Sequence, residues 1–336
     1  MTTPSSQRAS ELINGFWAPQ AINAACLLEI PDRLGGGPQT AEALAEAAGA
    51  HAPSVYRLMR ALQTLGLCAR DDDGRFELTE AGQPLRADAP GSVRGRALFT
   101  GDMLWKQFGD LHHQVKTGGL TQAIPTGKAG FHALQQDPAR LDAFQKAMAE
   151  SSTQAARAAM QAYDFRRFGK VLDLGGGYGG VLSELLKANP GQSGAVCDLG
   201  YLDAGATGYL ERAGVGGRAR FIGGDFFQSV PEGFDLYLMK FIIHDWDDEH
   251  ARLILGNCRK AAGAARAVLL EQVVPERLGQ SPADQAVIRG DLTMMSVGGK
   301  ERTAGEYRAL LAEAGWRLEA IIPTGDGFSV IEAVAA

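Results

Sequence analysis

The sequence predicts an α/β fold from about residue 165 onward, preceded by a part that is almost entirely helical. Two observations lead to this prediction. Before residue 165 apolar residues recur at helical spacing, whereas after it short apolar runs alternate with amphipathic stretches. Strands that alternate with helices form a parallel sheet covered on both faces, and ligands bind at the carboxyl ends of its strands.

The composition is ordinary for a soluble enzyme of about two domains. Of the 336 residues, 45% are hydrophobic and 21% charged, and the net charge of −6 argues against a mainly nucleic-acid-binding role. The four cysteines are scattered without a Cys-x-x-Cys pair, which predicts neither a disulfide framework nor a zinc site. No apolar run approaches a membrane span and no signal peptide is recognisable, so we expect a cytoplasmic enzyme.

The N-terminal hundred residues show the order helix, helix, hairpin. Thr40 can cap a helix over residues 41–48, and a second helix begins at Pro53. The segments Cys68–Arg70 and Phe76–Leu78 then flank an Asp-rich turn, which predicts a hairpin. This order is typical of a winged helix.

DNA is the obvious partner of a winged helix, but the charges argue against it. Residues 1–100 hold nine Arg or Lys and eleven Asp or Glu, a net charge of −2. The tip of the hairpin carries Asp71, Asp72 and Asp73, where a DNA-binding wing needs basic residues. We therefore expect a structural or dimerising role for this part of the chain.

Residues 92–160 are expected to form further long helices. Phe144 and Met148 lie one turn apart on an apolar stripe of this region. The stripe is either simple helix packing or one wall of a substrate pocket, and the pattern alone leaves both interpretations open.

The expected strands of the C-terminal part each lead to a chemically informative residue. The strands run over residues 170–174, 194–198, 219–223, 234–240 and 267–274. The side chains at or just beyond their ends are those of Asp173, Asp198, Asp225, Phe226, Lys240, His244 and Glu271. Ligands of parallel sheets bind at this edge, so these residues are the first candidates for a site.

A loop with five glycines in six positions follows the first of these strands. Gly175, Gly177 and Gly180 satisfy the dinucleotide pattern Gly-x-Gly-x-x-Gly, and the acidic Asp198 follows eighteen residues after Gly180. A pyrophosphate, however, needs free amides at a helix start, and Asp173 directly before the loop would repel phosphates. Asp173 suits a cationic group better, such as an α-amino group or a sulfonium.

The next two strand ends extend this pattern. Asp198 can accept hydrogen bonds from both hydroxyls of a ribose, and Asp225 with Phe226 offers an acceptor and an aromatic face to an adenine. An adenosine with a zwitterionic, phosphate-free tail describes S-adenosylmethionine. Each aspartate taken singly could instead cap a helix, but three at successive strand ends are harder to explain in that way. An NAD-dependent dehydrogenase remains an alternative.

With these motifs the chain resembles the class I S-adenosylmethionine-dependent methyltransferases. More narrowly, it is similar to the caffeic acid/hydroxyindole O-methyltransferase family, in its bacterial small-molecule form. The motifs that carry the resemblance are Leu172-Asp-Leu-Gly-Gly-Gly-Tyr-Gly, Gly223-Gly-Asp-Phe-Phe, Met239-Lys-Phe-Ile-Ile-His-Asp-Trp-Asp-Asp-Glu and Gly298-Gly-Lys-Glu-Arg-Thr303. The resemblance covers the whole chain.

The resemblance implies a specific architecture. We expect a Rossmann-like methyltransferase domain with a mostly parallel seven-stranded sheet and an N-terminal all-helical winged-helix dimerisation domain. Residues 1–100 would form the dimerisation domain, 101–164 a helical linker contributing to the substrate pocket, and 165–336 the S-adenosylmethionine-binding catalytic domain. Members of the family form interlocked homodimers, so a homodimer is expected here.

The resemblance also assigns roles to individual residues. The catalytic base is His244, and Glu271 and Glu301 fall on the two acidic positions that orient and polarise it. The residues expected to bind the cofactor are Asp173, Gly175, Gly177, Asp198, Asp225, Phe226 and Lys240. Those expected to line the substrate pocket are Phe144, Met148, Met294 and Met295. S-adenosyl-L-methionine is the expected cofactor, with S-adenosyl-L-homocysteine as product, and no metal is expected.

The implied activity is methylation of a phenolic hydroxyl on a small aromatic substrate of natural-product type. A phenol has a pKa of about 10 and imidazole one of about 6.5, so full deprotonation by a plain histidine is unfavourable. A carboxylate partner raises the pKa of the imidazole and stabilises the imidazolium, which favours transfer of the proton during attack. A phenylpropanoid substrate is not implied, because the segment between Met295 and Gly298 is shorter than in the plant enzymes.

Other functions remain open at this point. The same fold and cofactor serve N-methylation, or a relative that binds the cofactor without transferring a methyl group. A metal-assisted site at His244–Asp248 and a DNA-binding regulator are less favoured, because the carboxylates of that segment are bunched on one turn and the wing is acidic. Nucleic acid and membrane are not expected as partners.

Overall fold

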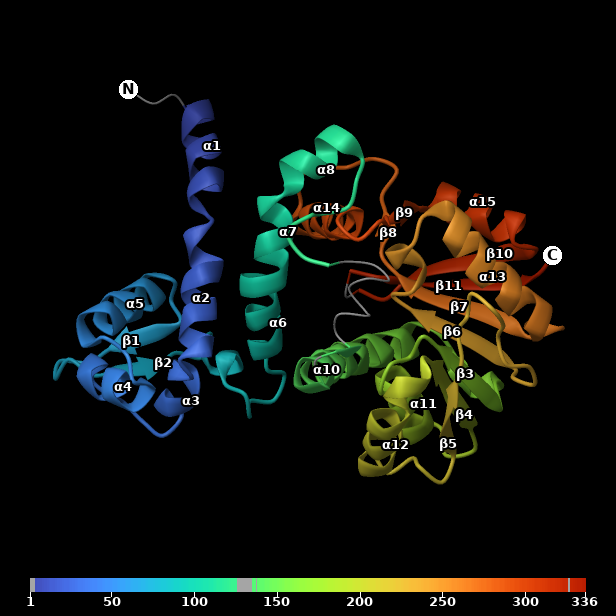
Figure 1. Ribbon diagram of the computed structural model, residues 1–336, viewed down its shortest axis with the longest axis horizontal. Coiled ribbons are helices and arrows are strands. Elements are labelled where there is room, and N and C mark those ends of the chain that lie inside the picture. Colours follow the sequence, from blue (N-terminus) through green and yellow to red (C-terminus); the bar gives the residue numbers. More distant parts are fainter. Residues whose placement is uncertain (1–3, 126–134, 137, 326) are drawn as a thin grey trace. The chain divides into compact units, whose positions relative to one another are not determined.

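The computed structural model describes residues 4–125, 135–136, 138–325 and 327–336. By its internal contacts the chain divides into two compact units, Met1–Gly109 and Asp110–Ala336. Figure 1 shows a helical N-terminal unit with a small hairpin and a C-terminal unit built on a large sheet. The fold class predicted from the sequence is therefore confirmed.

The N-terminal unit has the expected order of helix, helix and hairpin. Its helices are α1 (Pro4–Asn14), α2 (Trp17–Leu27), α3 (Ile30–Leu34), α4 (Ala41–Ala48) and α5 (Ala52–Thr64), and its hairpin is formed by β1 (Cys68–Arg70) and β2 (Phe76–Leu78). The Thr40 side chain accepts a hydrogen bond from the amide of Ala43, the N-cap that the sequence indicates. At the hairpin tip Arg75 pairs with Asp71 and Asp73, which offsets part of the negative charge of the turn.

Further helical segments follow the hairpin. They are η1 (Gln83–Leu85), α6 (Arg94–Phe99), η2 (Thr100–Leu104) and α7 (Trp105–Gly109) in the first unit, and α8 (Leu111–Thr117) and α10 (Pro138–Ala162) in the second. The expected linker, residues 101–164, is thus divided between the two units. Its contribution to a substrate pocket stays a prediction.

The C-terminal unit contains a seven-stranded sheet in the order β10-β11-β7-β6-β3-β4-β5. The strands are β3 (Lys170–Leu174), β4 (Ser193–Asp198), β5 (Ala219–Gly223), β6 (Leu236–Lys240), β7 (Arg266–Glu271), β10 (Trp316–Pro323) and β11 (Ser329–Ala335). The pairs among β3 to β7 are parallel, and β11 pairs antiparallel with both β7 and β10. The sheet reverses its strand order beside β3, the point at which ligands of such sheets bind.

Helices cover both faces of this sheet (Figure 1). They include α11 (Gly180–Ala188), α12 (Asp203–Arg212), α13 (Asp248–Ala262) and α15 (Ala304–Glu313). Successive residues of a central strand face opposite sides, so Val171 packs in the core formed with α10 and α11, and Leu172 in the core formed with α13 and α15. The near-continuous apolar strands of the sequence are explained by this burial on both faces.

One predicted strand is interrupted. The sequence suggested a single strand over residues 267–274, but β7 ends at Glu271 and a separate strand, β8 (Val273–Val274), pairs in parallel with β9 (Arg302–Thr303). At the break the Glu271 side chain accepts hydrogen bonds from two loop amides after β6. The small β8–β9 sheet is what brings Glu271 and Glu301 close together.

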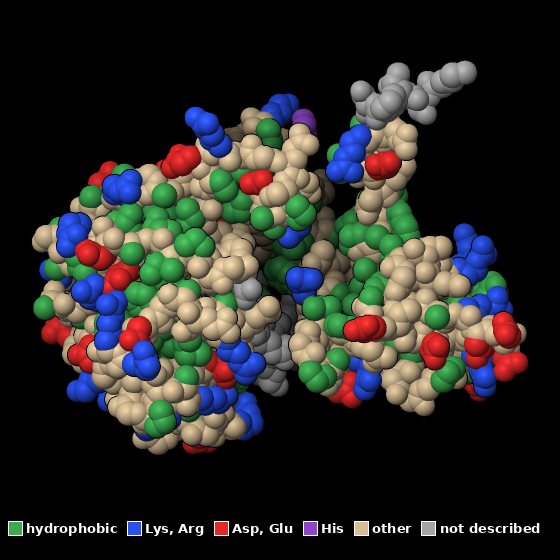
Figure 2. Space-filling view, turned by 180° about the vertical axis from the view of Figure 1, so that it is seen from behind, with side chains coloured by type: hydrophobic (Ala, Val, Ile, Leu, Met, Phe, Trp, Pro, Cys, Tyr) green, Lys and Arg blue, Asp and Glu red, His purple; other side chains and the backbone are tan. Residues whose placement is uncertain are grey.

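The surface carries charges of both signs. In the view of Figure 2, basic and acidic side chains are interspersed over each unit rather than gathered by sign. Among the described helices, none is both long and apolar enough to cross a membrane.

Candidate active site

The glycine loop after β3 is packed tightly against protein neighbours. Gly175 has a φ of +72°, and a Cβ there would lie 2.4 Å from Cδ1 of Ile242, in the loop after β6. A Cβ on Gly180 would lie 2.6 Å from the carbonyl oxygen of Ala149 on α10. The glycines therefore let the loop approach both α10 and the segment after β6, in addition to any role toward a ligand.

Asp173 is buried beneath this loop, with 1% of its surface exposed. Its Oδ2 accepts a hydrogen bond from the amide of Leu182 at 3.3 Å, so it partly serves the N-terminus of α11. Burial raises the pKa of Asp173 to about 7, with the Asp198 charge adding to the effect while the Leu182 amide and Lys240 oppose it. Among the described residues no cation lies within ion-pair distance of this carboxylate, although the charge of Lys240 acts on it.

Asp198 is joined to the glycine loop directly. Its Oδ2 accepts from the amide of Gly177 at 2.8 Å, and its Oδ1 from the amide of Leu199 at 2.7 Å. Burial raises the pKa of Asp198, although both amides act against the shift. Two carboxylates whose pKa values are raised by burial therefore lie beside one glycine loop, an arrangement that favours a cationic ligand group.

The Asp225 carboxylate accepts hydrogen bonds from residues of its own turn. Oδ1 accepts from the amide of Phe227 at 2.9 Å and Oδ2 from the side chain of Gln228 at 3.3 Å. Phe226 lies edge-on to Trp246 at 6.3 Å between ring centroids, and its ring would touch a Cβ at Gly175. An aromatic wall thus stands next to the glycine loop, as the sequence pattern suggested.

Lys240 lies at the end of β6 among acids. Burial lowers the pKa of Lys240 to about 8, a shift that Glu271, Asp173 and Asp245 partly oppose. Its Nζ lies 4.2 Å above the ring centroid of Phe241. The acidic residues whose charges act on Lys240 are therefore Glu271, Asp173 and Asp245.

His244 lies in the 3-10 turn η5 (Ile243–Asp245) with 8% of its surface exposed. Its Nδ1 lies 2.9 Å from Oε1 of Glu301 and 3.7 Å from Oε2 of Glu271. The structure thus brings together the three residues that the family resemblance grouped.

Each glutamate takes part in hydrogen bonds that involve a backbone amide. Glu271 is fully buried, and its Oε1 accepts from the amides of Ile242 and Ile243 at 3.1 and 2.9 Å. The amide of Glu301 donates to Oδ1 of Asp291 at 2.9 Å. Among the described residues, Oε2 of Glu271 and Oε2 of Glu301 have no hydrogen-bond partner.

The segment 298–303 runs alongside His244 because Gly299 has no side chain. A Cβ on Gly299 would lie 1.9 Å from the carbonyl oxygen of His244, and the amide of Lys300 donates to that same oxygen at 2.9 Å. This close approach places Glu301 opposite the imidazole. Thr303 then caps α15 in a capping box with Glu306.

The charges around His244 alter its proton affinity. Burial alone lowers the pKa of the imidazole, but Glu271, the hydrogen bond to Glu301 and the charge of Asp245 outweigh it and raise the pKa to about 9. Burial raises the pKa of Glu271 to about 7, and the His244 charge opposes that shift. The arrangement can accept a proton at Nε2 and stabilise the resulting imidazolium.

Two residues of this site were not assigned from the sequence. Oδ1 of Asp245 lies 3.5 Å from Nε2 of His244, on the side of the ring away from Glu301. Arg302, fully buried, donates to the carbonyls of Ile243 and Trp246 at 3.0 and 2.8 Å and so holds the turn that carries His244. The signal for Arg302 was its place in the 298–303 motif, but a buried arginine there is not evident from residue type.

The residues expected to line the substrate pocket are all partly exposed. Phe144 and Met148 lie on α10, whose neighbouring Gln145 would touch a Cβ at Gly177. Met294 and Met295 end helix α14 (Pro282–Met295), and the Met294 carbonyl accepts from the amide of Gly299 at 3.0 Å. The methionine pair is therefore tied to the segment beside His244, whereas contact of any of the four with a substrate stays a prediction.

The donor atoms around His244 are also of types that bind metals. One ligand atom from each of His244, Glu271 and Glu301 can be chosen so that all three lie within 4.8 Å of one another. In the structure, however, Nδ1 is engaged by Glu301 and Oε1 of Glu271 by two amides. The hydrogen bond between His244 and Glu301 is a carboxylate–imidazole contact of the kind that the family resemblance implies.

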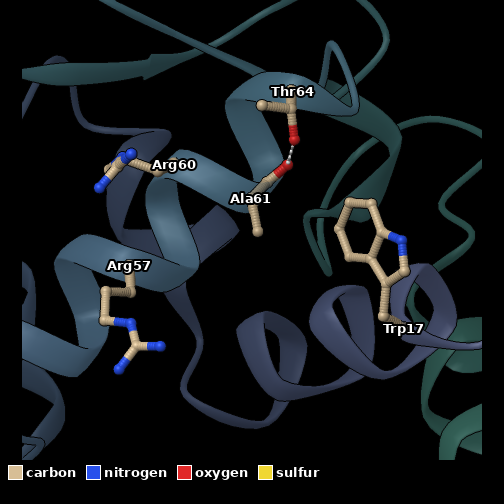
Figure 3. Close-up of a pocket in the computed structure, with 5 residues that line it drawn as sticks. All are labelled: Trp17, Arg57, Arg60, Ala61 and Thr64. Carbon is tan, nitrogen blue, oxygen red and sulfur yellow. Dashed lines mark hydrogen bonds between the residues drawn. The ribbon is translucent and has the colours of Figure 1, made fainter.

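The N-terminal unit has a shallow pocket of its own, with a volume of about 340 Å³. Trp17 of α2 and Arg57, Arg60, Ala61 and Thr64 of α5 line it (Figure 3). Thr64 donates its hydroxyl to the carbonyl of Ala61 at 2.7 Å, so it is satisfied within its own helix. None of the residues proposed from the sequence for cofactor, base or substrate lies in this pocket.

Comparisons with known proteins agree with this geometry. The O-methyltransferase domain family matches residues 108–317, and the O-methyltransferase dimerisation domain family matches residues 10–87. A phenazine O-methyltransferase from Lysobacter antibioticus is 35% identical over 98% of this chain and 96% of its own length. An 8-amino-8-demethylriboflavin N,N-dimethyltransferase from Streptomyces davaonensis is 32% identical over 93% of this chain and 90% of its own.

A solved structure extends the likeness to three dimensions. An O-methyltransferase from neocarzinostatin biosynthesis, in complex with S-adenosylmethionine and 2-hydroxy-5-methyl naphthoic acid, is 34% identical and superposes with a TM-score of 0.80. The match covers 95% of this chain and 96% of that one. The sequence motifs, the geometry at the strand ends and these matches all indicate the same family. The chain therefore belongs to the family of S-adenosylmethionine-dependent O-methyltransferases that carry an N-terminal dimerisation domain.

Proposed function

We propose that this enzyme methylates a hydroxyl group on a small aromatic substrate of natural-product type, with His244 as the general base. The observation that carries the proposal is the 2.9 Å contact between Nδ1 of His244 and Glu301, which leaves Nε2 for the acceptor hydroxyl. Relatives named for phenazine and naphthoate O-methylation support an aromatic acceptor.

The cofactor is proposed to bind at the ends of β3, β4 and β5. S-adenosylmethionine, when bound, supplies an electrophilic methyl group on a positively charged sulfur. Asp173 is a buried carboxylate that feels the charge of Lys240 but forms no close ion pair among the described residues, so it fits a ligand with an α-amino or sulfonium group. Asp198 and the Asp225–Phe226 pair offer acceptors and a ring face to ribose and adenine, and Gly175, Gly177 and Lys240 complete the proposed set.

The residues of the chain contribute a general base and the carboxylates that stabilise its protonated form. Nε2 of His244 accepts the hydroxyl proton as the oxygen attacks, and Glu301 at Nδ1 stabilises the imidazolium that forms. Glu271 adds a second negative charge 3.7 Å from Nδ1. Positioning of the hydroxyl, proposed for Phe144, Met148, Met294 and Met295, supplies much of the remaining acceleration.

N-methylation is the second candidate function, and one observation favours it. The riboflavin-type relative named as an N,N-dimethyltransferase is 32% identical to this chain over 93% of its length. An arylamine needs no strong base before attack, so a His244 variant would retain activity toward an amine acceptor. The two candidates therefore differ in their dependence on His244.

A homodimer and a cytoplasmic location are further parts of the proposal. The dimerisation family matches residues 10–87, and large apolar side chains there are exposed in the isolated chain, among them Leu12 at 64%, Ile13 at 71% and Phe16 at 60%. Exposed apolar surface of this kind marks an interface. Four free, buried cysteines accord with a reducing compartment. Light scattering of the purified chain tests the dimer.

The experiment that tests the activity is a paired substrate screen. The enzyme and its His244→Ala variant are incubated with S-adenosylmethionine and matched aromatic alcohols and amines, and products are sought by mass spectrometry as a gain of one methyl group. The proposal predicts methylated phenols with the wild type and a loss of about 10²–10⁴-fold with the variant. Methylation by the variant at the wild-type rate would show that His244 is not the base.

A further inference from the structure

Phe241 has an unusual backbone conformation. Among the described residues only Glu29 and Phe241 are non-glycine residues with positive φ, and Phe241 has a φ of +55°. For a bulky side chain this left-handed conformation is strained and persists only where the surroundings impose it. Phe241 lies between Lys240 at the end of β6 and the turn that carries His244.

The strained backbone builds a binding site for a carboxylate. The amide of Phe241 still pairs with the carbonyl of Leu270 at 3.1 Å, as in the strand before it. Phe241 is then left-handed, and Ile242 is right-handed with a φ of −110° and a ψ of −49°. When a left-handed residue is followed by a right-handed one, the backbone N–H groups after them point toward a single anion. Here the amides of Ile242 and Ile243 both donate to Oε1 of Glu271.

This anchoring determines the direction of the other carboxylate oxygen. With Oε1 held by two amides, Oε2 of Glu271 remains without a hydrogen-bond partner among the described residues and lies 3.7 Å from Nδ1 of His244. The charge that acts on the imidazole is thus placed by the backbone turn at Phe241.

The Phe241 ring makes a second, separate contact with the base. It stacks on the imidazole of His244 with 5.0 Å between centroids and an interplanar angle of 27°. Nζ of Lys240 lies 4.2 Å from the centroid of the same ring, and Phe328 packs edge-to-face against it with 5.9 Å between ring centroids. An aromatic face in contact with two groups that carry positive charge stabilises those charges through its quadrupole.

Hydrophobic burial alone does not account for this conformation. Phe241 is only partly buried, so its ring gains less from burial than a core phenylalanine, yet its backbone is strained. The left-handed turn positions Glu271 and the ring stacks on His244, so the strained conformation serves the His244–Glu271 pair.

We propose that Phe241 is a positioning residue for the base, acting through its left-handed backbone on Glu271 and through its ring on His244. The inference rests on the proposed function, because it assumes that His244 accepts the proton from the acceptor. The ring and the backbone of Phe241 contribute separately, and each contribution is tested with its own variant.

The ring contribution is tested with Phe241→Leu, and Phe328→Leu is the matched control because Phe328 touches the Phe241 ring without stacking on His244. Loss of the ring weakens the stabilisation of the imidazolium, so the acidic limb of the kcat/KM profile moves to lower pH by roughly half a unit. The control keeps the wild-type limb. Nuclear magnetic resonance titration of the His244 imidazole measures the same shift without turnover.

The backbone contribution is tested by comparing Phe241→Ala with Phe241→Gly. Both variants lack the ring, but only glycine adopts positive φ without strain. We expect a kcat for Phe241→Gly about five-fold or more above that of Phe241→Ala, with similar KM for S-adenosylmethionine. Thermal melts and cofactor titration by calorimetry establish that the variants compared are folded.

Two results would overturn the inference. One is an imidazole titration in Phe241→Leu that coincides with those of the wild type and Phe328→Leu. The other is an alanine variant that equals or exceeds the glycine variant in kcat. Failure of the proposed function gives a different pattern, since His244→Ala would then keep wild-type turnover whatever the Phe241 variants do.

Discussion

Nδ1 of His244 lies 2.9 Å from Oε1 of Glu301, although 57 residues separate them in the chain. The contact distinguishes the two ring nitrogens, since a proton on Nδ1 faces the carboxylate and leaves Nε2 as the acceptor in the neutral imidazole. Asp245 lies 3.5 Å from Nε2 and keeps that side of the ring negative. The direction of proton transfer is thereby set from substrate to Nε2.

The Glu301 carboxylate is expected to raise kcat rather than cofactor affinity. Glu301→Gln keeps the shape of the side chain but removes the charge that stabilises the imidazolium. We expect kcat to fall by about 10- to 100-fold, a part of the general-base contribution, with little change in the Kd of S-adenosylmethionine. The control is Glu313→Gln, an exposed glutamate paired with Arg252. Equal losses in both variants would contradict the assignment.

The rate should rise with pH from neutral toward alkaline conditions. His244 must be neutral to accept a proton, and its pKa is raised to about 9 because Glu271, Glu301 and Asp245 together outweigh the effect of burial. Below this value the imidazole is protonated and inactive as a base, so kcat/KM increases as pH approaches 9. In Glu301→Gln the limb moves to lower pH, toward the ordinary imidazole value of about 6.5. Measuring kcat/KM against pH for both enzymes checks the direction in which the limb moves.

Cofactor binding should release protons near neutral pH. Burial raises the pKa of Asp173 to about 7, so the free enzyme holds a fraction of a proton there. A cationic ligand group favours the ionised carboxylate, lowers that pKa and expels the proton. Affinity for S-adenosylmethionine therefore weakens as the pH falls below 7.

Calorimetry in two buffers of different ionisation enthalpy measures the protons released. We expect release by the wild type at pH 7 and none attributable to this site in Asp173→Asn, which also binds more weakly. Tight binding by the variant with unchanged proton release would show that Asp173 does not face the cationic group.

The parallel sheet and its strand-end acids could be predicted because their signals are local. Short apolar runs mark strands buried on both faces, and the acids follow directly after them. The cap at Thr40 was equally readable, since its side chain bonds to the amide of Ala43, only three residues away. The carboxyl-edge rule then places Asp173 and Asp198 together without knowledge of the fold.

The geometry around His244 could not be worked out from the residues alone. Glu301 reaches the imidazole through β8 and β9, two strands of two residues each, which are too short to leave a periodic pattern. Its role came from the family resemblance. The left-handed turn at Phe241 is also invisible in the sequence, because nothing about phenylalanine favours positive φ.

The close approach at Gly299 gives a prediction that joins stability to activity. A Cβ there would lie 1.9 Å from the carbonyl oxygen of His244 and 2.6 Å from the carbonyl carbon of Asp245. Both neighbours are backbone atoms, so Gly299→Ala must push the two segments apart. The hydrogen bond from the Lys300 amide to His244 is then lost, and Glu301 moves away from the imidazole.

We expect Gly299→Ala to lower the free energy of unfolding by about 1–3 kcal/mol and to reduce kcat more than it raises KM. Gly256→Ala is the matched control, since Gly256 lies inside α13 and a Cβ there meets nothing within 4 Å. Helix propensity predicts that this control gains about 0.5–1 kcal/mol with unchanged turnover. Urea unfolding measures the free energy of unfolding of both variants, and steady-state kinetics measures their kcat and KM. A Gly299→Ala enzyme with wild-type stability and kcat would mean that the 298–303 segment does not hold Glu301 against His244.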